Sequence, residues 1–122
     1  MNRDHLYAFY GSLREGMSNH RRYQHGIELV FTETITGYRL HALRHFPYAV
    51  RTGSAEDRIV VEICKVTDPG IEQSIHELEM SVGYYYDEVE IRGQRVGIYL
   101  YPESGAEPLV KDGDWVKFFG SR

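Results

Sequence analysis

The sequence predicts a mixed α+β fold, in which a mainly antiparallel sheet or small barrel is crossed by one main helix. Extended segments rich in β-branched and aromatic residues account for most of the chain, which is typical of strands. Only residues 69–82 combine sufficient length with the spacing of a helix that buries one face. The last two extended segments, 84–92 and 95–101, follow each other as the strands of a hairpin do. A doubly wound parallel sheet would need more helices than this pattern offers.

Length and composition are those of one globular domain, which we expect to span residues 1–122. Hydrophobic residues make up 42% of the chain and charged residues 26%. The formal charge is −4 and no block is rich in Lys or Arg, which argues against nucleic acid or an acidic membrane surface as the main partner. No apolar stretch approaches the roughly 20 residues of a membrane span, and the N-terminus lacks a secretion signal. We therefore expect a cytoplasmic protein with a small-molecule partner.

The first extended segment, residues 5–10, ends at a glycine. Gly11 has access to backbone angles that are barred to other residues, and Gly16 closes the same loop. Such a loop can turn sharply and present main-chain N–H groups to an anion or a carbonyl oxygen. The same residues also fit a strand followed by an ordinary turn, and taken alone they favour that interpretation. Other residues must decide between the two.

The middle of the chain continues with one short helix and further strands. Residues 18–25 predict a helix capped by Ser18 and ended by Gly26. Gly37 divides or bends the first of the extended segments that follow, which lie at residues 28–43, 46–50 and 58–65. The third is the most apolar and contains Cys64, the single cysteine, which we expect to be a buried and unreactive thiol.

The main helix is predicted from its start signal and its apolar stripe. The segment Thr67-Asp68-Pro69 supplies a capping side chain and a proline that suits the first turn. The stripe and the residue that ends it are Ile71, Ile75, Leu78, Val82 and Gly83. The two strands of the hairpin come next, joined through Gly93 and Gln94. A loop over residues 102–108 and a turn before Trp115 complete the chain.

Glu79 is the candidate catalytic residue. On a helix it falls at the rim of the apolar stripe, close to Ile75, so its carboxyl group should be half-buried. Burial without a cation raises the pKa of a carboxyl group and makes it a proton shuttle near neutral pH. Glu77 projects to another side of the helix. The alternative is that Glu79 is a boundary residue held in a salt bridge.

Two further kinds of site are not favoured by the sequence. His41 and His45 are four residues apart, but in a strand or loop that spacing does not bring them together, and no acidic third ligand accompanies them. We therefore predict no metal site. A nucleophilic role for Ser12 would call for the pattern Gly-x-Ser-x-Gly and a His/Asp pairing, neither of which is evident.

Several motifs, in order along nearly the whole chain, resemble the landmarks of the γ-glutamylcyclotransferase-like family. They are residues 9–16 (FYGSLREG), 19–20 (NH), 37–40 (GYRL), 46–47 (FP), 78–79 (LE), 86 with 89 (Y and V), and 110–115 (VKDGDW). Each motif alone is weak, but the ordered set is fairly specific. The resemblance implies a small mixed barrel crossed by a helix, which is similar to the fold predicted from the residues.

The resemblance also implies a reaction. The α-amine of a γ-glutamyl group attacks its own γ-carbonyl carbon, which releases 5-oxoproline and a free amine or amino acid without any cofactor. The matches place the acid/base glutamate of the family on Glu79. They place its substrate-binding residues on Tyr10, Gly11, Ser12, Leu13 and Tyr86. Neighbouring tyrosines at positions 84 and 85 leave the register of Tyr86 open.

Departures from the family pattern affect the choice of substrate. His76 stands where the family often has Asp, and Met80 stands where a glycine commonly follows the glutamate. The family includes enzymes for γ-glutamyl amino acids, for γ-glutamyl-ε-lysine and for γ-glutamyl protecting groups in biosynthesis, as well as members without an established substrate. Two alternatives to an enzyme stay open: a non-catalytic protein that binds small carboxylates, and a purely structural or interaction domain.

Overall fold

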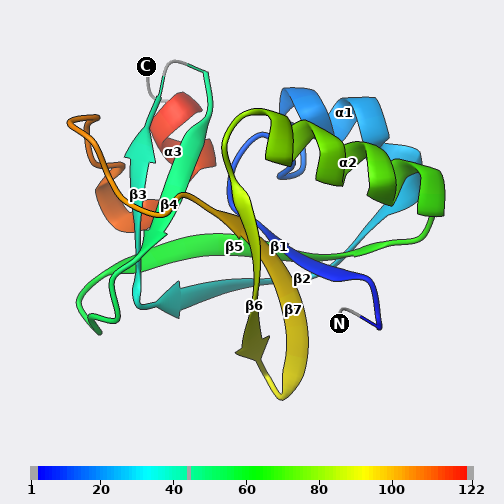
Figure 1. The fold of residues 1–122 in the computed structure, drawn as a ribbon, viewed down its shortest axis with the longest axis horizontal. Coiled ribbons are helices and arrows are strands. Elements are labelled where there is room, and N and C mark those ends of the chain that lie inside the picture. Colours follow the sequence, from blue (N-terminus) through cyan, green and yellow to red (C-terminus); the bar gives the residue numbers. More distant parts are fainter. Residues whose placement is uncertain (1–2, 44, 121–122) are drawn as a thin grey trace.

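The computed structural model describes residues 3–43 and 45–120, and it confirms the mixed α+β fold with a mainly antiparallel sheet (Figure 1). Five strands form the larger sheet in the order β2-β5-β1-β7-β6. Their bounds are Leu6–Phe9 (β1), Ile27–Thr36 (β2), Arg58–Val66 (β5), Tyr85–Ile91 (β6) and Gln94–Leu100 (β7). All neighbours pair antiparallel except β1 and β7. The sheet is open, because β2 and β6 are its two edges and the described strands do not pair across them.

A smaller sheet consists of β3 (Tyr38–Ala42) and β4 (Pro47–Arg51). Gly37 separates β2 from β3 with a φ of +89°, so residues 28–43 form two strands rather than one. The main-chain N–H of Tyr101 donates to the carbonyl of Ala49 at 2.9 Å, which fastens β4 to the end of β7. Pro47 is thereby held beside the loop that follows β1.

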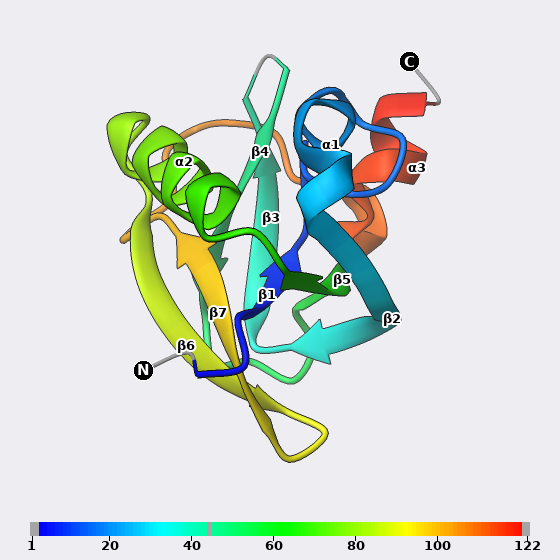
Figure 2. The same cartoon turned by 90° about the vertical axis from the view of Figure 1, so that its right-hand side faces the viewer.

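The main helix, α2, covers Pro69–Ser81. The Asp68 carboxylate accepts hydrogen bonds from the N–H groups of Gly70 and Ile71 at 2.8 and 3.1 Å, as the capping signal predicts. Ile75 is buried, but Val82 is 41% exposed, so the predicted stripe is wrong at its last position. The reason is that the helix ends before Val82, which no longer has helical backbone angles. Figure 2 shows α2 above the strands of the larger sheet.

The short helix α1 (Ser18–Tyr23) passes into a 3-10 turn over Gln24–Gly26. The predicted cap is wrong: Ser18 is the first helical residue, and no side chain caps the helix. Instead, the carbonyl oxygen of Ser12 accepts hydrogen bonds from the N–H groups of Asn19 and His20 at 3.1 and 3.0 Å. A main-chain acceptor from the preceding loop therefore replaces a side-chain cap.

The β6–β7 hairpin is confirmed, with its turn one residue earlier than predicted. Ile91 pairs with Gln94, so the turn residues are Arg92 and Gly93, whose φ angles of 51° and 77° suit a tight hairpin. Arg92 at the tip donates to the Glu33 carboxylate at 2.7 Å, and its guanidinium lies over the Phe31 ring. A side-chain contact thus joins the hairpin to β2, although strand pairing does not close the sheet.

The turn predicted before Trp115 is a 3-10 turn (Lys111–Gly113), whereas α3 (Trp115–Gly120) was not predicted from the sequence. The Trp115 side chain is fully buried. In the core strand β5, Cys64 is free and buried as expected, and burial raises the pKa of its thiol to about 12. No helix among the described residues is long and apolar enough to cross a membrane.

Candidate active site

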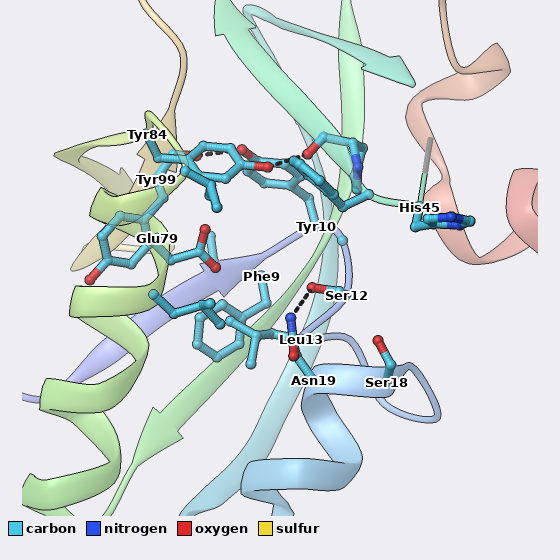
Figure 3. Close-up of a pocket in the computed structure, with 16 residues that line it drawn as sticks. Phe9, Tyr10, Ser12, Leu13, Ser18, Asn19, His45, Glu79, Tyr84 and Tyr99 are labelled. Carbon is cyan, nitrogen blue, oxygen red and sulfur yellow. Dashed lines mark hydrogen bonds between the residues drawn. The ribbon is translucent and has the colours of Figure 1, made fainter. Parts of the chain in front are cut away.

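A cavity of about 260 Å³ lies between the loop after β1 and the C-terminal half of α2 (Figure 3). Four of its lining residues are those predicted for the substrate loop: Tyr10, Gly11, Ser12 and Leu13. Glu79 lines the other side. The remaining walls come from β1, α1, the start of β4 with the two residues before it, α2 with the segment after it, and β7, including Phe9, Ser18, Asn19, His45, Phe46, Pro47, Leu78, Val82, Tyr84 and Tyr99. The topology therefore brings the predicted acid and the predicted loop to one cavity.

Gly11 is required at its position by close packing. Its φ is not in the positive region, so the special backbone angles expected of it are not used. A Cβ added to Gly11 would lie 2.8 Å from Cγ and Cδ of Pro47, too close for any other residue. Gly16 does have a positive φ of +86°, as expected for the residue that closes the loop. The two glycines shape the loop for different reasons.

Buried ion pairs fix the loop to the rest of the fold. Arg14 is buried; its Nε donates to the Glu62 carboxylate at 3.0 Å and its Nη1 to the Asp114 carboxylate at 2.8 Å. The main-chain N–H of Glu15 donates to the other oxygen of Glu62 at 2.7 Å. Partial burial alone would raise the pKa of Asp114, but the hydrogen bonds from Arg14 and from the Lys117 N–H, together with the charges of these two residues, outweigh it, and the pKa is lowered. The loop is therefore held to β5 and to the segment before α3.

The loop presents unused hydrogen-bond donors. Within residues 3–43 and 45–120, the main-chain N–H groups of Gly11, Ser12 and Leu13 donate no hydrogen bond. The hydroxyl oxygen of Ser12 accepts a hydrogen bond from Nδ2 of Asn19 at 2.8 Å. Neighbouring main-chain N–H groups of this kind bind anions and oxyanions. Because Ser12 is bonded to an amide rather than to a histidine, it has no base to activate it as a nucleophile.

Glu79 is half-buried, as predicted, and Figure 3 shows its carboxyl group pointing into the cavity. None of the residues that the structure describes forms a hydrogen bond or an ion pair with this carboxyl group, so the salt-bridged alternative finds no support. Burial raises the pKa of Glu79 from 4.5 to about 7. A group with this pKa exchanges a proton readily near neutral pH. Glu77, by contrast, is exposed.

Tyrosine side chains close the cavity above Glu79. The Tyr10 hydroxyl donates to the carbonyl of Tyr99 at 2.5 Å and accepts from the N–H of Ala49 at 3.2 Å, and the Tyr84 hydroxyl donates to the carbonyl of Pro47. Burial raises the pKa of the Tyr10 and Tyr84 hydroxyls, so both stay protonated and neutral. They therefore act as fixed walls of the cavity.

The lining includes Tyr84 but not Tyr86. The Tyr86 hydroxyl donates instead to the Glu88 carboxylate at 2.9 Å, and its ring packs edge-on against Tyr7 and Tyr99. Residues 84–86 are all tyrosine, so sequence alone gave no signal to choose between them. Tyr84 lies beside the cavity because it directly follows Gly83, in the short segment after the end of α2.

The two histidines of the rejected metal site differ in their surroundings. His41 is buried, and its Nδ1 donates to the carbonyl of Glu107 at 2.9 Å, while its Nε2 accepts from Nε of Arg39 at 3.2 Å. These two hydrogen bonds hold the His41 ring in place. His45 is exposed and lines the cavity mouth. The described residues contain no group of three His, Cys, Asp or Glu side chains that could hold a metal ion.

The fold places the loop after β1 and Glu79 on one cavity, and sequence comparison gives the family. Residues 7–117 match the family model described as "Gamma-glutamyl cyclotransferase, AIG2-like". The chain is also 31% identical over 112 residues to a Vibrio cholerae serotype O1 protein named "Putative gamma-glutamylcyclotransferase", with 91% of this chain and 95% of that protein covered. This chain belongs to the AIG2-like gamma-glutamyl cyclotransferase family.

Solved structures share the fold. An uncharacterized protein from Pyrococcus horikoshii superposes with a TM-score of 0.80 at 27% identity, with 95% of this chain and 93% of that chain covered. The solution structure of ytfP from Escherichia coli gives a TM-score of 0.71 at 22% identity, with 91% and 96% covered. The second likeness concerns the fold alone. Both neighbours match over almost their whole length.

Proposed function

We propose that this protein is a cyclotransferase that converts a γ-glutamyl amine or γ-glutamyl amino acid to 5-oxoproline and a free amine. One observation carries the proposal: the Glu79 carboxyl, with a pKa of about 7, and the donor loop at residues 10–13 line one cavity from opposite sides. Family membership supports the same activity. The roles of individual residues are argued below from their chemistry.

Charge complementarity orients the substrate. A γ-glutamyl group carries an α-carboxylate, an α-ammonium and the γ-carbonyl that reacts. The free N–H groups of Gly11, Ser12 and Leu13 suit the oxygen atoms, whereas the Glu79 carboxylate suits the ammonium. In the opposite orientation the two carboxylates would repel each other and the ammonium would face N–H donors. The amine is therefore presented to Glu79, a group that can accept its proton.

Glu79 then moves protons in both directions. Its carboxylate takes a proton from the α-ammonium, and the freed amine attacks the γ-carbonyl carbon to close a five-membered ring. Main-chain N–H groups of the loop stabilise the oxyanion that forms. The bond to the leaving nitrogen breaks as Glu79 returns a proton to it. The ring nitrogen loses two protons and the released ammonium gains two, so the protein ends unchanged and no water is consumed.

The protein's main contribution is to hold one conformation. Attack within one molecule needs the amine and the carbonyl carbon in contact, and an extended γ-glutamyl chain has to fold back on itself to achieve this. A small cavity with aromatic walls favours the folded conformer. Tyr10 and Tyr84, with their hydroxyls bonded to carbonyl oxygens, supply rigid walls for this purpose.

The test is to incubate the full chain with a panel of γ-glutamyl amines and γ-glutamyl amino acids and to measure 5-oxoproline. We expect release from at least one substrate, reduced about 100-fold or more in Glu79→Gln. Glu77→Gln, on the exposed side of the same helix, is the matched control and should retain the activity. A protein that only binds carboxylates would bind 5-oxoproline equally well with Glu79→Gln and release no product. Absence of turnover across the panel would reject the proposal.

A further inference from the structure

Two hydrogen bonds join Asn19 to Ser12 beside the cavity, and a third joins His20 to Ser12. Nδ2 of Asn19 donates to Oγ of Ser12 at 2.8 Å, and Figure 3 shows this bond on the wall that faces Glu79. The Ser12 carbonyl also accepts from the N–H groups of Asn19 and His20. Both the backbone and the side chain of Ser12 are therefore positioned by the start of α1.

The hydrogen bond from Asn19 fixes the role of the Ser12 hydroxyl. A hydroxyl has one proton to donate and lone pairs to accept with. Because Oγ of Ser12 already accepts from Nδ2, and donates to none of the described residues, its own proton is left for an acceptor in the cavity. The hydroxyl is thereby a fourth unused donor on the loop that carries the three free N–H groups.

The charges of the cavity indicate what this donor binds. Of the described lining residues, none is Lys or Arg, and Glu79 is the one acid. A ligand carboxylate in this cavity therefore depends on neutral donors. It also lies best on the loop side, far from Glu79, because two nearby carboxylates repel each other.

We propose that Asn19 is a positioning residue that sets the Ser12 hydroxyl as a donor to the α-carboxylate of the bound γ-glutamyl group. The proposal rests on the proposed cyclotransferase function. The carboxylate is present in the substrate and also in the product 5-oxoproline, and it does not react. Asn19 and Ser12 consequently contribute to binding throughout the reaction, so their loss raises KM and leaves kcat nearly unchanged.

The experiment measures 5-oxoproline affinity by calorimetry and turnover kinetics for wild type, Ser12→Ala, Asn19→Leu, Ser12→Ala/Asn19→Leu and Asn19→Asp. A thermal unfolding scan of each variant checks that it folds. We expect Ser12→Ala and Asn19→Leu each to weaken 5-oxoproline binding about tenfold, the usual effect of losing a hydrogen bond to a charged group. The double variant should be no weaker than Ser12→Ala, because Asn19 acts through Ser12.

Asn19→Asp preserves shape and reverses the polarity of the contact. At neutral pH an aspartate would take the Ser12 proton, so binding should be weaker than in Asn19→Leu. The deficit relative to wild type should shrink toward about pH 4, where a protonated Asp can again donate to Oγ. A merely structural role for Asn19 predicts no such pH dependence. If Asn19→Leu fails to fold, Asn19→Asp still tests the positioning role of Asn19.

The outcomes separate the two proposals. If wild type releases 5-oxoproline while the Asn19 variants bind it as wild type does, the positioning role is rejected and the cyclotransferase function stands. The positioning role would also be rejected if Asn19→Leu weakened 5-oxoproline binding as much in the Ser12→Ala variant as it does in wild type. A fall in kcat at unchanged KM would contradict the assignment to the unreactive carboxylate. If wild type neither binds 5-oxoproline nor produces it, both proposals fail.

Discussion

Gly11 lies against the ring of Pro47, so close that an added Cβ would be 2.8 Å from two of its ring carbons. Gly11→Ala must therefore displace either the loop or β4. We expect a loss of about 1–3 kcal/mol in the free energy of unfolding and a fall in activity of about 100-fold, because the donor loop would be misplaced. Urea unfolding and 5-oxoproline release measure the two effects.

Gly16→Ala is the matched comparison for that prediction. Gly16 has a positive φ of +86°, and an added Cβ would meet no atom within 4 Å. We expect about 1 kcal/mol of destabilisation from backbone strain alone, with the cavity intact. Equal activity losses in both variants would show that packing against Pro47 has no special importance.

Arg14 is predicted to be the main anchor of the loop. Arg14→Met leaves the buried Glu62 carboxylate without its cation, and breaking a buried pair in this way costs about 3–5 kcal/mol. Adding Glu62→Gln removes the uncompensated charge and should restore part of the stability. Chemical denaturation of the single and double variants tests this; a double variant less stable than Arg14→Met would contradict it.

The raised pKa of Glu79 predicts how stability depends on pH. A carboxyl group whose pKa rises from 4.5 in the unfolded chain to about 7 in the fold binds its proton more tightly when folded. The free energy of unfolding should therefore fall as pH rises from 4.5 to 7. Glu79→Gln has no carboxyl group to titrate at this position, so its stability does not fall in this way. Its free energy of unfolding should exceed that of wild type by about 1–2 kcal/mol at pH 8, and the difference should vanish near pH 4.5. A constant difference across pH would show that Glu79 has an ordinary pKa.

Tyr84 and Tyr86 can be separated by hydroxyl deletion. Tyr84→Phe leaves the buried carbonyl of Pro47 without its donor, so we expect about 1–2 kcal/mol of destabilisation and a higher KM. Tyr86→Phe removes a hydroxyl that contacts Glu88 away from the cavity, so KM should change little. A tenfold rise in KM for Tyr86→Phe, with none for Tyr84→Phe, would favour the original assignment of Tyr86 to the substrate.

Periodic patterns were enough to predict most of the fold. The strands, the hairpin and α2 each carry their own local signals, such as the Asp68 cap. The half-buried position of Glu79 likewise followed from its place on the helix. These features depend on residues close together in the chain, which is why sequence alone was sufficient to find them.

Features that depend on distant residues, or on a segment too short to show a pattern, were missed. Ser12 caps α1 through its carbonyl, a group that every residue has and that no pattern can reveal. The Arg92 contact with Glu33 joins segments that only the bend of the sheet brings together. α3 is too short to show a helical period. The unused backbone angles of Gly11 show that packing against Pro47, rather than a turn, accounts for that glycine.

The most direct test of the central claim is to identify the product formed in heavy-oxygen water from the best γ-glutamyl substrate. Ring closure by the substrate's own amine through Glu79 predicts unlabelled 5-oxoproline from wild type, and about 100-fold less from Glu79→Gln at the same protein concentration. Glutamate carrying solvent oxygen would show hydrolysis instead, and unlabelled 5-oxoproline formed equally fast by Glu79→Gln would show that Glu79 does not move the protons. Either result would contradict the account.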